Sequence, residues 1–80
     1  MAIGPDDSSR PEAVDRYLGQ KVRARREELD MTPEELAFLS NIETPALEEI
    51  EAGARRITPA EMIALAAALG ITIEEFFEGL

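Results

Sequence analysis

The chain has 80 residues, the length of a single domain, with 17 acidic and 8 basic residues and a formal net charge of −9. Such a charge repels DNA at long range unless the bases gather on one face. The absence of cysteine and histidine excludes a disulfide framework, a thiolate metal site and the commonest general base.

The N-terminal segment, residues 1–11 (MAIGPDDSSRP), is polar and has no apolar period. This composition is typical of a disordered arm ahead of a domain over residues 12–80. No apolar run of the chain reaches transmembrane length, and the N-terminus lacks a signal-peptide core, so we expect a cytoplasmic protein.

A first helix is predicted to begin at Pro11, because apolar residues then recur at three- and four-residue spacing. This apolar stripe consists of Val14, Leu18, Val22 and Leu29. It is interrupted where Arg25 and Arg26 stand. We expect one of these arginines to point inward, where its guanidinium needs a buried partner.

Threonines predict the starts of the next four helices, and each is expected to act first as an N-cap. They are Thr32, Thr44, Thr58 and Thr72. Three of them stand three residues before a Glu and predict capping boxes; Pro follows Thr32, Thr44 and Thr58 at the first helical position. Ends are predicted near Asn41, Gly53 and Gly70, which tolerate the left-handed conformation.

The inner faces of these helices are predicted from their apolar residues. The expected inward residues are Leu36, Ala37 and Leu39 in the second helix, Leu47 and Ile50 in the third, and Met62, Ile63, Leu65, Ala66 and Leu69 in the fourth. The sequence thus predicts an all-α fold of five helices. Only three or four residues separate the second and third, which is the spacing of a helix-turn-helix.

Several segments, in this order and at these intervals, resemble the Cro/C1-type helix-turn-helix family, also called the XRE family. They are LGQKVRARR (residues 18–26), TPEELA (32–37), EAG (51–53), LAAALGI (65–71) and EFF (75–77). The resemblance runs from about Val14 to Leu80. It implies a lambda-repressor-like domain of a bacterial-type transcriptional regulator, which binds DNA through its third helix as a dimer. It also implies that Arg26 pairs with Glu51, which supplies the partner that the inward arginine requires.

The third helix departs from the family pattern, because it is acidic where relatives carry polar or basic residues. Residues 27–54 contain nine acids and no base. Three residues of this helix are candidates for facing bases: Thr44, Glu48 and Glu49. A Glu can accept a hydrogen bond only from cytosine N4, and it repels phosphate. The two glutamates therefore have three interpretations: a solvated face, an element that repels DNA, or a docking surface for a basic partner.

Bases elsewhere are candidates for phosphate contacts: Arg23, Arg55 and Arg56. By the resemblance, the loop with Arg55 and Arg56 touches phosphate; the alternative is that these two compensate a helix dipole. Arg23 could belong to a basic patch with Lys21 and Arg25, and the alternative is a solvated face.

The terminal aromatics have two interpretations as well. Phe76, Phe77 and Leu80 are either core residues or a contact to a second copy, since the family's terminal region often helps dimerisation. Adjacent aromatics in a helix cannot both face one core, so one of the two is expected to be exposed.

No convergent carboxylates, nucleophile–base pair or phosphate loop indicates an enzyme, and no cofactor, metal or small-molecule ligand is indicated. Two functions follow. The first is a small XRE-type transcriptional regulator that binds DNA as a homodimer. The alternative is an interaction module that has lost DNA reading and binds a basic partner, or a related regulator, through its acidic face.

Overall fold

The computed structural model describes residues 12–79, and these residues form five helices and no strand. The helices are α1 (Ala13–Glu28), α2 (Pro33–Ser40), α3 (Thr44–Glu51), α4 (Pro59–Leu69) and α5 (Ile73–Phe76). The predicted all-α, five-helix fold is confirmed. The predicted disordered arm, residues 1–11, lies outside the described residues, as does Leu80.

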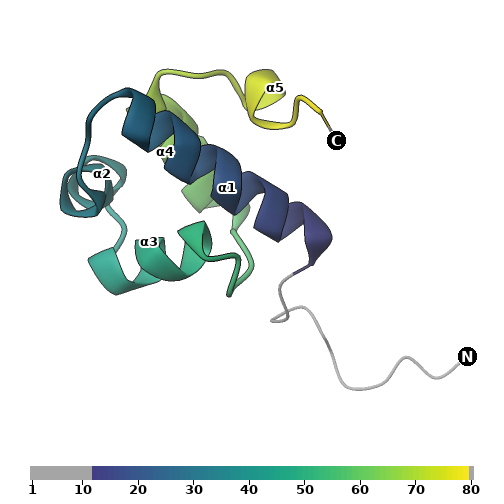
Figure 1. Ribbon diagram of the computed structural model, residues 1–80, viewed down its shortest axis with the longest axis horizontal. Coiled ribbons are helices and arrows are strands. Elements are labelled where there is room, and N and C mark those ends of the chain that lie inside the picture. Colours follow the sequence, from purple (N-terminus) through teal and green to yellow (C-terminus); the bar gives the residue numbers. More distant parts are fainter. Residues whose placement is uncertain (1–11, 80) are drawn as a thin grey trace, which may run out of the picture.

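Helix α1 crosses the molecule and packs on α3 and α4, while α2 packs on α3 and α4 and α5 follows against α4 (Figure 1). The apolar stripes meet in one core. Its fully buried side chains are Phe76, Leu18, Leu36, Leu47, Ile50, Leu65, Leu69 and Val22. Every one of the five helices therefore contributes to the core, and α3 is fixed to the rest of the domain through Leu47 and Ile50.

Capping boxes set the starts of α2, α4 and α5, as predicted. The backbone N–H groups of Glu35, Glu61 and Glu75 donate to the hydroxyls of Thr32, Thr58 and Thr72 at 3.1, 3.1 and 3.0 Å. Each Glu carboxylate accepts in return from the N–H of its Thr. Because each box satisfies donors that a helix start leaves unpaired, these boundaries are encoded locally.

Two predicted helix starts are wrong in detail. Helix α1 begins at Ala13 rather than Pro11, and the N–H of Glu12 donates to Asp15 Oδ2 at 2.9 Å. Helix α3 has Glu43 as its N-cap residue, with no side-chain cap, and Thr44 is its first helical residue. Thr44 lacks a Glu three residues later, so no capping box fixes it at the cap position.

Three residues that were predicted to face inward are exposed: Leu29 (40%), Leu39 (59%) and Ile63 (62%). Leu29 lies just beyond the last turn of α1 as its C-cap residue. In α2 the buried face is set by Leu36, Ala37 and Ser40, and the helical repeat of 3.6 residues turns Leu39 away from that face. The same repeat turns Ile63 away from the buried face of α4.

Gly19 determines how closely α1 approaches α3. A Cβ atom at this position would fall on the backbone carbonyl oxygen of Ile50. Only glycine leaves room for that carbonyl, so the residue fixes the depth at which α3 sits on α1. The sequence offers no signal for this role, because a glycine within a helical pattern usually only weakens the prediction of a helix.

Candidate nucleic-acid interface

The turn between α2 and α3 has three residues, Asn41, Ile42 and Glu43. Asn41 adopts the left-handed conformation with φ 56°, and the N–H of Ile42 donates to the carbonyl of Ala37 at 2.9 Å. This hydrogen-bonded end of α2 reverses the chain within one short turn. Helix α3 therefore crosses α2 in the arrangement of a helix-turn-helix.

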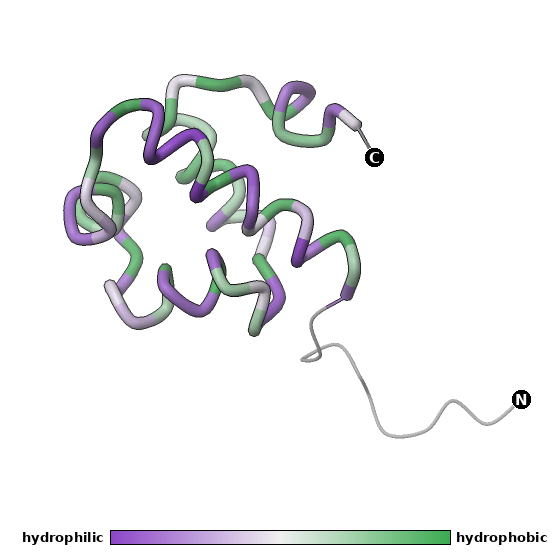
Figure 2. The backbone as a smooth tube through the Cα atoms, viewed as in Figure 1, coloured by the Kyte–Doolittle hydropathy of each residue, from purple (hydrophilic) through white to green (hydrophobic). Residues whose placement is uncertain are grey.

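Helix α3 presents an inner and an outer face. Leu47 and Ile50 are fully buried against the core. The exposed residues of α3 and its flanks are Glu43, Pro45, Glu48, Glu49 and Ala52. Figure 2 shows that hydrophilic and hydrophobic residues alternate along α3, whereas hydrophobic residues predominate along α4. The outer face of α3 thus offers carboxylates to a partner and no basic side chain.

A buried ion pair joins α1 to the end of α3, and it is the pair expected from the family resemblance. Arg26 Nε donates to Glu51 Oε2 at 2.7 Å and Arg26 Nη2 donates to Glu51 Oε1 at 3.0 Å. The two side chains are only 10% and 9% exposed, and Arg26 Nη1 also donates to the Met31 carbonyl at 2.8 Å. The hydrogen bond to Glu51 raises the pKa of Arg26 above its ordinary value. Glu51 is therefore not part of the outer face.

The three base-facing candidates lie on α3 as follows. Glu48 and Glu49 are exposed, and no ion pair joins either carboxylate to a base among residues 12–79. Thr44 is half-buried at the first position of the helix. All three are accessible to a ligand that lies along α3, and the two carboxylates make this face negative.

The three candidates for phosphate contact are engaged in ion pairs with carboxylates. Arg55 Nη1 lies 3.0 Å from Glu61 Oε2, and Arg56 Nη2 lies 3.2 Å from Glu12 Oε1. Arg23 Nε pairs at 3.2 Å with Glu27 Oε2, one turn further along α1. A phosphate at any of these arginines has to compete with a carboxylate that is already bound.

Asp15, which sequence reasoning missed, holds the loop that carries Arg55 and Arg56. Its carboxylate is buried, and Oδ1 accepts a hydrogen bond from the N–H of Ile57 at 3.0 Å. This bond ties the loop after α3 to the first turn of α1. No sequence signal reveals it, because the partners are 42 residues apart.

Lys21 and Arg25, the other two members of the possible basic patch on α1, donate to backbone carbonyls of the C-terminal segment. Lys21 Nζ donates to the carbonyls of Glu75 and Glu78 at 2.8 and 2.9 Å, and Arg25 Nε donates to the carbonyl of Leu69 at 3.1 Å. The Tyr17 hydroxyl also donates to the Glu78 carbonyl. These donors bind carbonyls at the end of α4, within α5 and just beyond α5, where helix ends leave carbonyls available. Both bases therefore attach the C-terminal segment to α1.

The terminal aromatics separate as the sequence predicts. Phe76 is fully buried in its own domain, whereas Phe77 is 37% exposed. Phe76 is therefore a core residue and offers no side-chain surface to a second copy. Of the candidates for a partner contact, Phe77 is the one that the structure leaves accessible, and Leu80 lies outside the described part of the chain.

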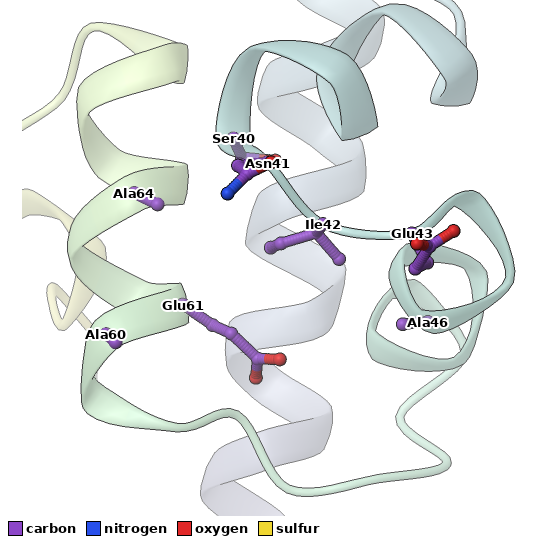
Figure 3. A pocket seen from close by; sticks show the side chains of 8 residues that line it. All are labelled: Ser40, Asn41, Ile42, Glu43, Ala46, Ala60, Glu61 and Ala64. Carbon is purple, nitrogen blue, oxygen red and sulfur yellow. The ribbon is translucent and has the colours of Figure 1, made fainter.

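A groove of about 480 Å³ separates the α2–α3 turn from α4 (Figure 3). Ile42 of the turn and Glu61 of α4 line it, as do Ala46, Ala60 and Ala64.

Across residues 12–79, no three acidic side chains converge as metal ligands. No helix in the same range is long and apolar enough to cross a membrane.

The Helix-turn-helix family model matches residues 22–76 of the chain. The chain is also 34% identical over 67 residues to an uncharacterized transcriptional regulator in the ATPase CF(0) region of Rhodospirillum rubrum. That match covers 84% of this chain and 62% of the relative, so this chain spans less than two thirds of the relative's length.

Several solved structures are similar to this chain. The restriction-modification controller protein C.AhdI from Aeromonas hydrophila is 32% identical, with a TM-score of 0.78 over 82% of this chain and 100% of that one. The clp gene regulator ClgR from C. glutamicum is 25% identical, with a TM-score of 0.76 over 81% and 84%. The controller protein C.Esp1396I, solved as a tetramer with its 35 base-pair operator, is 25% identical, with a TM-score of 0.76 over 84% and 88%. None of these names describes an enzyme.

Proposed function

Because the chain belongs to the helix-turn-helix family, in its Cro/C1 or XRE type, we propose that it is a small transcriptional regulator that binds DNA as a homodimer through α3. The proposal rests on one observation: the domain holds α3 by its inner face and exposes its outer face. Its inner face is fixed by Leu47, Ile50 and the Arg26–Glu51 pair, and its outer face presents exposed residues from Pro45 to Ala52. A rigid helix held in this way fits the major groove.

Base contacts would come from Thr44, Glu48 and Glu49. Glutamate accepts a hydrogen bond from cytosine N4, and a threonine methyl group can contact the thymine methyl group. The chemistry of this face therefore favours an operator with cytosines opposite the middle of α3. Two copies related by a two-fold axis would place their α3 helices in successive major grooves, ~34 Å apart.

Phosphate contacts would come from the loop after α3, which Asp15 holds against α1. Arg55 and Arg56 would exchange their partners Glu61 and Glu12 for phosphate oxygens. Arg23 would do the same with Glu27. Each exchange releases a counterion from DNA but also breaks an ion pair, so affinity should depend strongly on salt. Action on DNA within the cytoplasm is part of this proposal.

A second candidate function rests on the charge of α3. Glu48 and Glu49 face outward with no basic partner in the described part of the chain. A groove lined with phosphate repels such a surface. The domain would then act as an interaction module that docks on a basic protein or pairs with a related regulator.

Selection from a random duplex pool decides between these functions. The full chain is incubated with the pool at low and moderate salt, and bound duplexes are sequenced. The first function predicts enrichment of a two-fold symmetric sequence with cytosines in each half-site, and altered enrichment for Glu48→Gln with Glu49→Gln. An unenriched pool for the parent, together with DNA binding that appears only in Glu48→Gln with Glu49→Lys, would instead support the second.

A further inference from the structure

Phe38 is the most exposed large apolar side chain among the described residues, at 85%. It lies on the outer face of α2, one helical turn after Glu34, which is also exposed. Residues four apart on a helix lie side by side on one face. The outer face of α2 therefore presents a carboxylate next to an aromatic ring that no part of the domain covers.

This ring stands at the edge of a hollow of about 300 Å³ between α2 and the start of α3. The hollow is lined by Glu34, Ala37, Phe38, Ile42, Glu43 and Thr44, together with Asn41. Glu34 comes from α2, and Glu43 comes from the turn, immediately before α3. A ligand that enters the hollow thus meets two carboxylates from two elements and the face or edge of one ring.

Six of the seven bases among residues 12–79 are engaged elsewhere, and the seventh, Arg16, lies against Gly53, beyond the far end of α3 from the hollow. Arg23, Arg26, Arg55 and Arg56 are paired with carboxylates, and Lys21 and Arg25 with carbonyls. By contrast, no ion pair involves Glu34 or Glu43 among residues 12–79, and neighbouring Glu35 is held in the capping box of α2. The cation that this hollow suits must therefore come from outside the described domain.

The chemistry of the hollow selects a cation. A guanidinium or ammonium group is attracted by an aromatic face and pairs with carboxylates on either side. A nucleic-acid phosphate, in contrast, is repelled by both carboxylates. Arginine fits better than lysine, because its planar group stacks on a ring while its N–H groups reach two acceptors.

We propose that the hollow between α2 and α3 binds an arginine side chain of a basic segment in a second, different protein, stacked on Phe38 and paired with Glu34 and Glu43. This site lies beside the outer face of α3 and does not include Glu48 or Glu49. It goes beyond DNA reading and does not require it, because the ring and both carboxylates come from α2 and the turn.

The test uses the full chain and a fluorescein-labelled 12-residue peptide of arginine, leucine and serine, with binding followed by fluorescence anisotropy. A matched peptide has citrulline, the neutral isostere, in place of each arginine. The arginine peptide should bind at least tenfold more tightly than the citrulline peptide. Phe38→Ala should weaken binding ~fivefold or more, which is the size of a partly desolvated cation–π contact.

Two double variants that remove the same charge provide the control. Glu34→Gln with Glu43→Gln should weaken binding of the arginine peptide ~tenfold. Glu48→Gln with Glu49→Gln should change it less than twofold. Equal weakening by the two double variants, or unchanged binding by Phe38→Ala, would show only nonspecific attraction to an acidic protein and would overturn the proposal.

DNA is tested in parallel with the duplexes enriched from the random pool. The proposal predicts that Phe38→Ala leaves duplex binding unchanged, since phosphate is repelled from the hollow. Loss of duplex binding in Phe38→Ala, with peptide binding intact, would assign the hollow to DNA and overturn the proposal. If the chain did not recognise DNA at all, the pool would stay unenriched. That result would contradict the proposed DNA-binding function, and the peptide measurements would still decide whether the hollow binds arginine.

Discussion

Helix α1 and the outward surface of α2 and α3 use charge in opposite ways. The bases of α1 include Lys21, Arg25 and Arg26, and each is bound to a carbonyl or carboxylate of another element. The acids that face outward on α2 and α3, among them Glu34, Glu48 and Glu49, have no ion-pair partner in residues 12–79. In a chain with a net charge of −9, these bases of α1 therefore stabilise the fold, whereas the outward carboxylates of α2 and α3 remain available to a partner.

This difference shows why counting charges misjudges the domain. Eight bases suggest some attraction to DNA, but most of those described already hold α3, the loop after it and the C-terminal segment in place. A partner meets mainly the carboxylates.

The largest effect is expected where the two regions meet, at the Arg26–Glu51 pair. Glu51→Ala leaves the guanidinium of Arg26 buried without a carboxylate, which should cost ~3–5 kcal/mol of unfolding free energy. Denaturation in urea measures this loss. Arg23→Gln, which breaks an exposed pair with Glu27, should cost no more than ~1 kcal/mol. If both variants lost the same small amount, the buried pair would not hold α3 in place.

The approach of α1 to α3 provides the next test. Gly19→Ala places a methyl group on the carbonyl of Ile50, and overpacking of this kind costs ~1–3 kcal/mol. Gly70→Ala serves as the control, because a Cβ there meets nothing within 4 Å and only the left-handed φ of 69° is strained. That strain should cost ~1 kcal/mol. Thermal unfolding and DNA binding should both be affected more by Gly19→Ala, since it displaces α3.

The helix starts allow a finer comparison between scaffold and interface. Thr58→Ala removes the capping box of α4 and should cost ~1 kcal/mol. Thr44→Ala removes no cap, because α3 begins without a side-chain cap, and should cost less than ~0.5 kcal/mol. Urea denaturation of the two variants is the measurement. An equal loss in both would mean that Thr44 stabilises α3 in the free domain and is not reserved for a ligand.

The smallest effect concerns Glu75, which lies near the bases of α1. Hydrogen bonds from the backbone and then the side chain of Thr72 lower the pKa of Glu75 below its ordinary value of 4.5. A lowered pKa means that the stabilisation is complete above the ordinary value and is lost as pH falls through the folded-state value. An NMR titration should show this lowered pKa, and Thr72→Ala should raise it while leaving it below 4.5, because the backbone hydrogen bond remains.

The sequence predicts local features of this domain well and distant ones poorly. The capping boxes at Thr32, Thr58 and Thr72 were predictable, because all their partners lie within three residues. The exposure of Leu39 and Ile63 was not, since neighbouring apolar residues in a helix compete for one inner face.

The candidate site follows the same division. The location of the candidate interface on the helix-turn-helix formed by α2 and α3 was predictable from the spacing of the helix starts. The resemblance indicated that Arg26 and Glu51 form a pair. The partners of Lys21, Arg25 and Asp15 lie 42 to 57 residues away, and no local pattern reveals them. The engagement of Arg55 and Arg56 with carboxylates could likewise be found only in the folded chain.

The central claim, that α3 is the surface that meets DNA, is tested most directly by NMR of the isotopically labelled full chain with a duplex enriched from the random pool. The account predicts that amide resonances of Thr44, of residues 46–52 and of residues 55–56 shift most, while those of α5 stay in place. A bound duplex that shifts α5 or α4 and leaves α3 unchanged would contradict it.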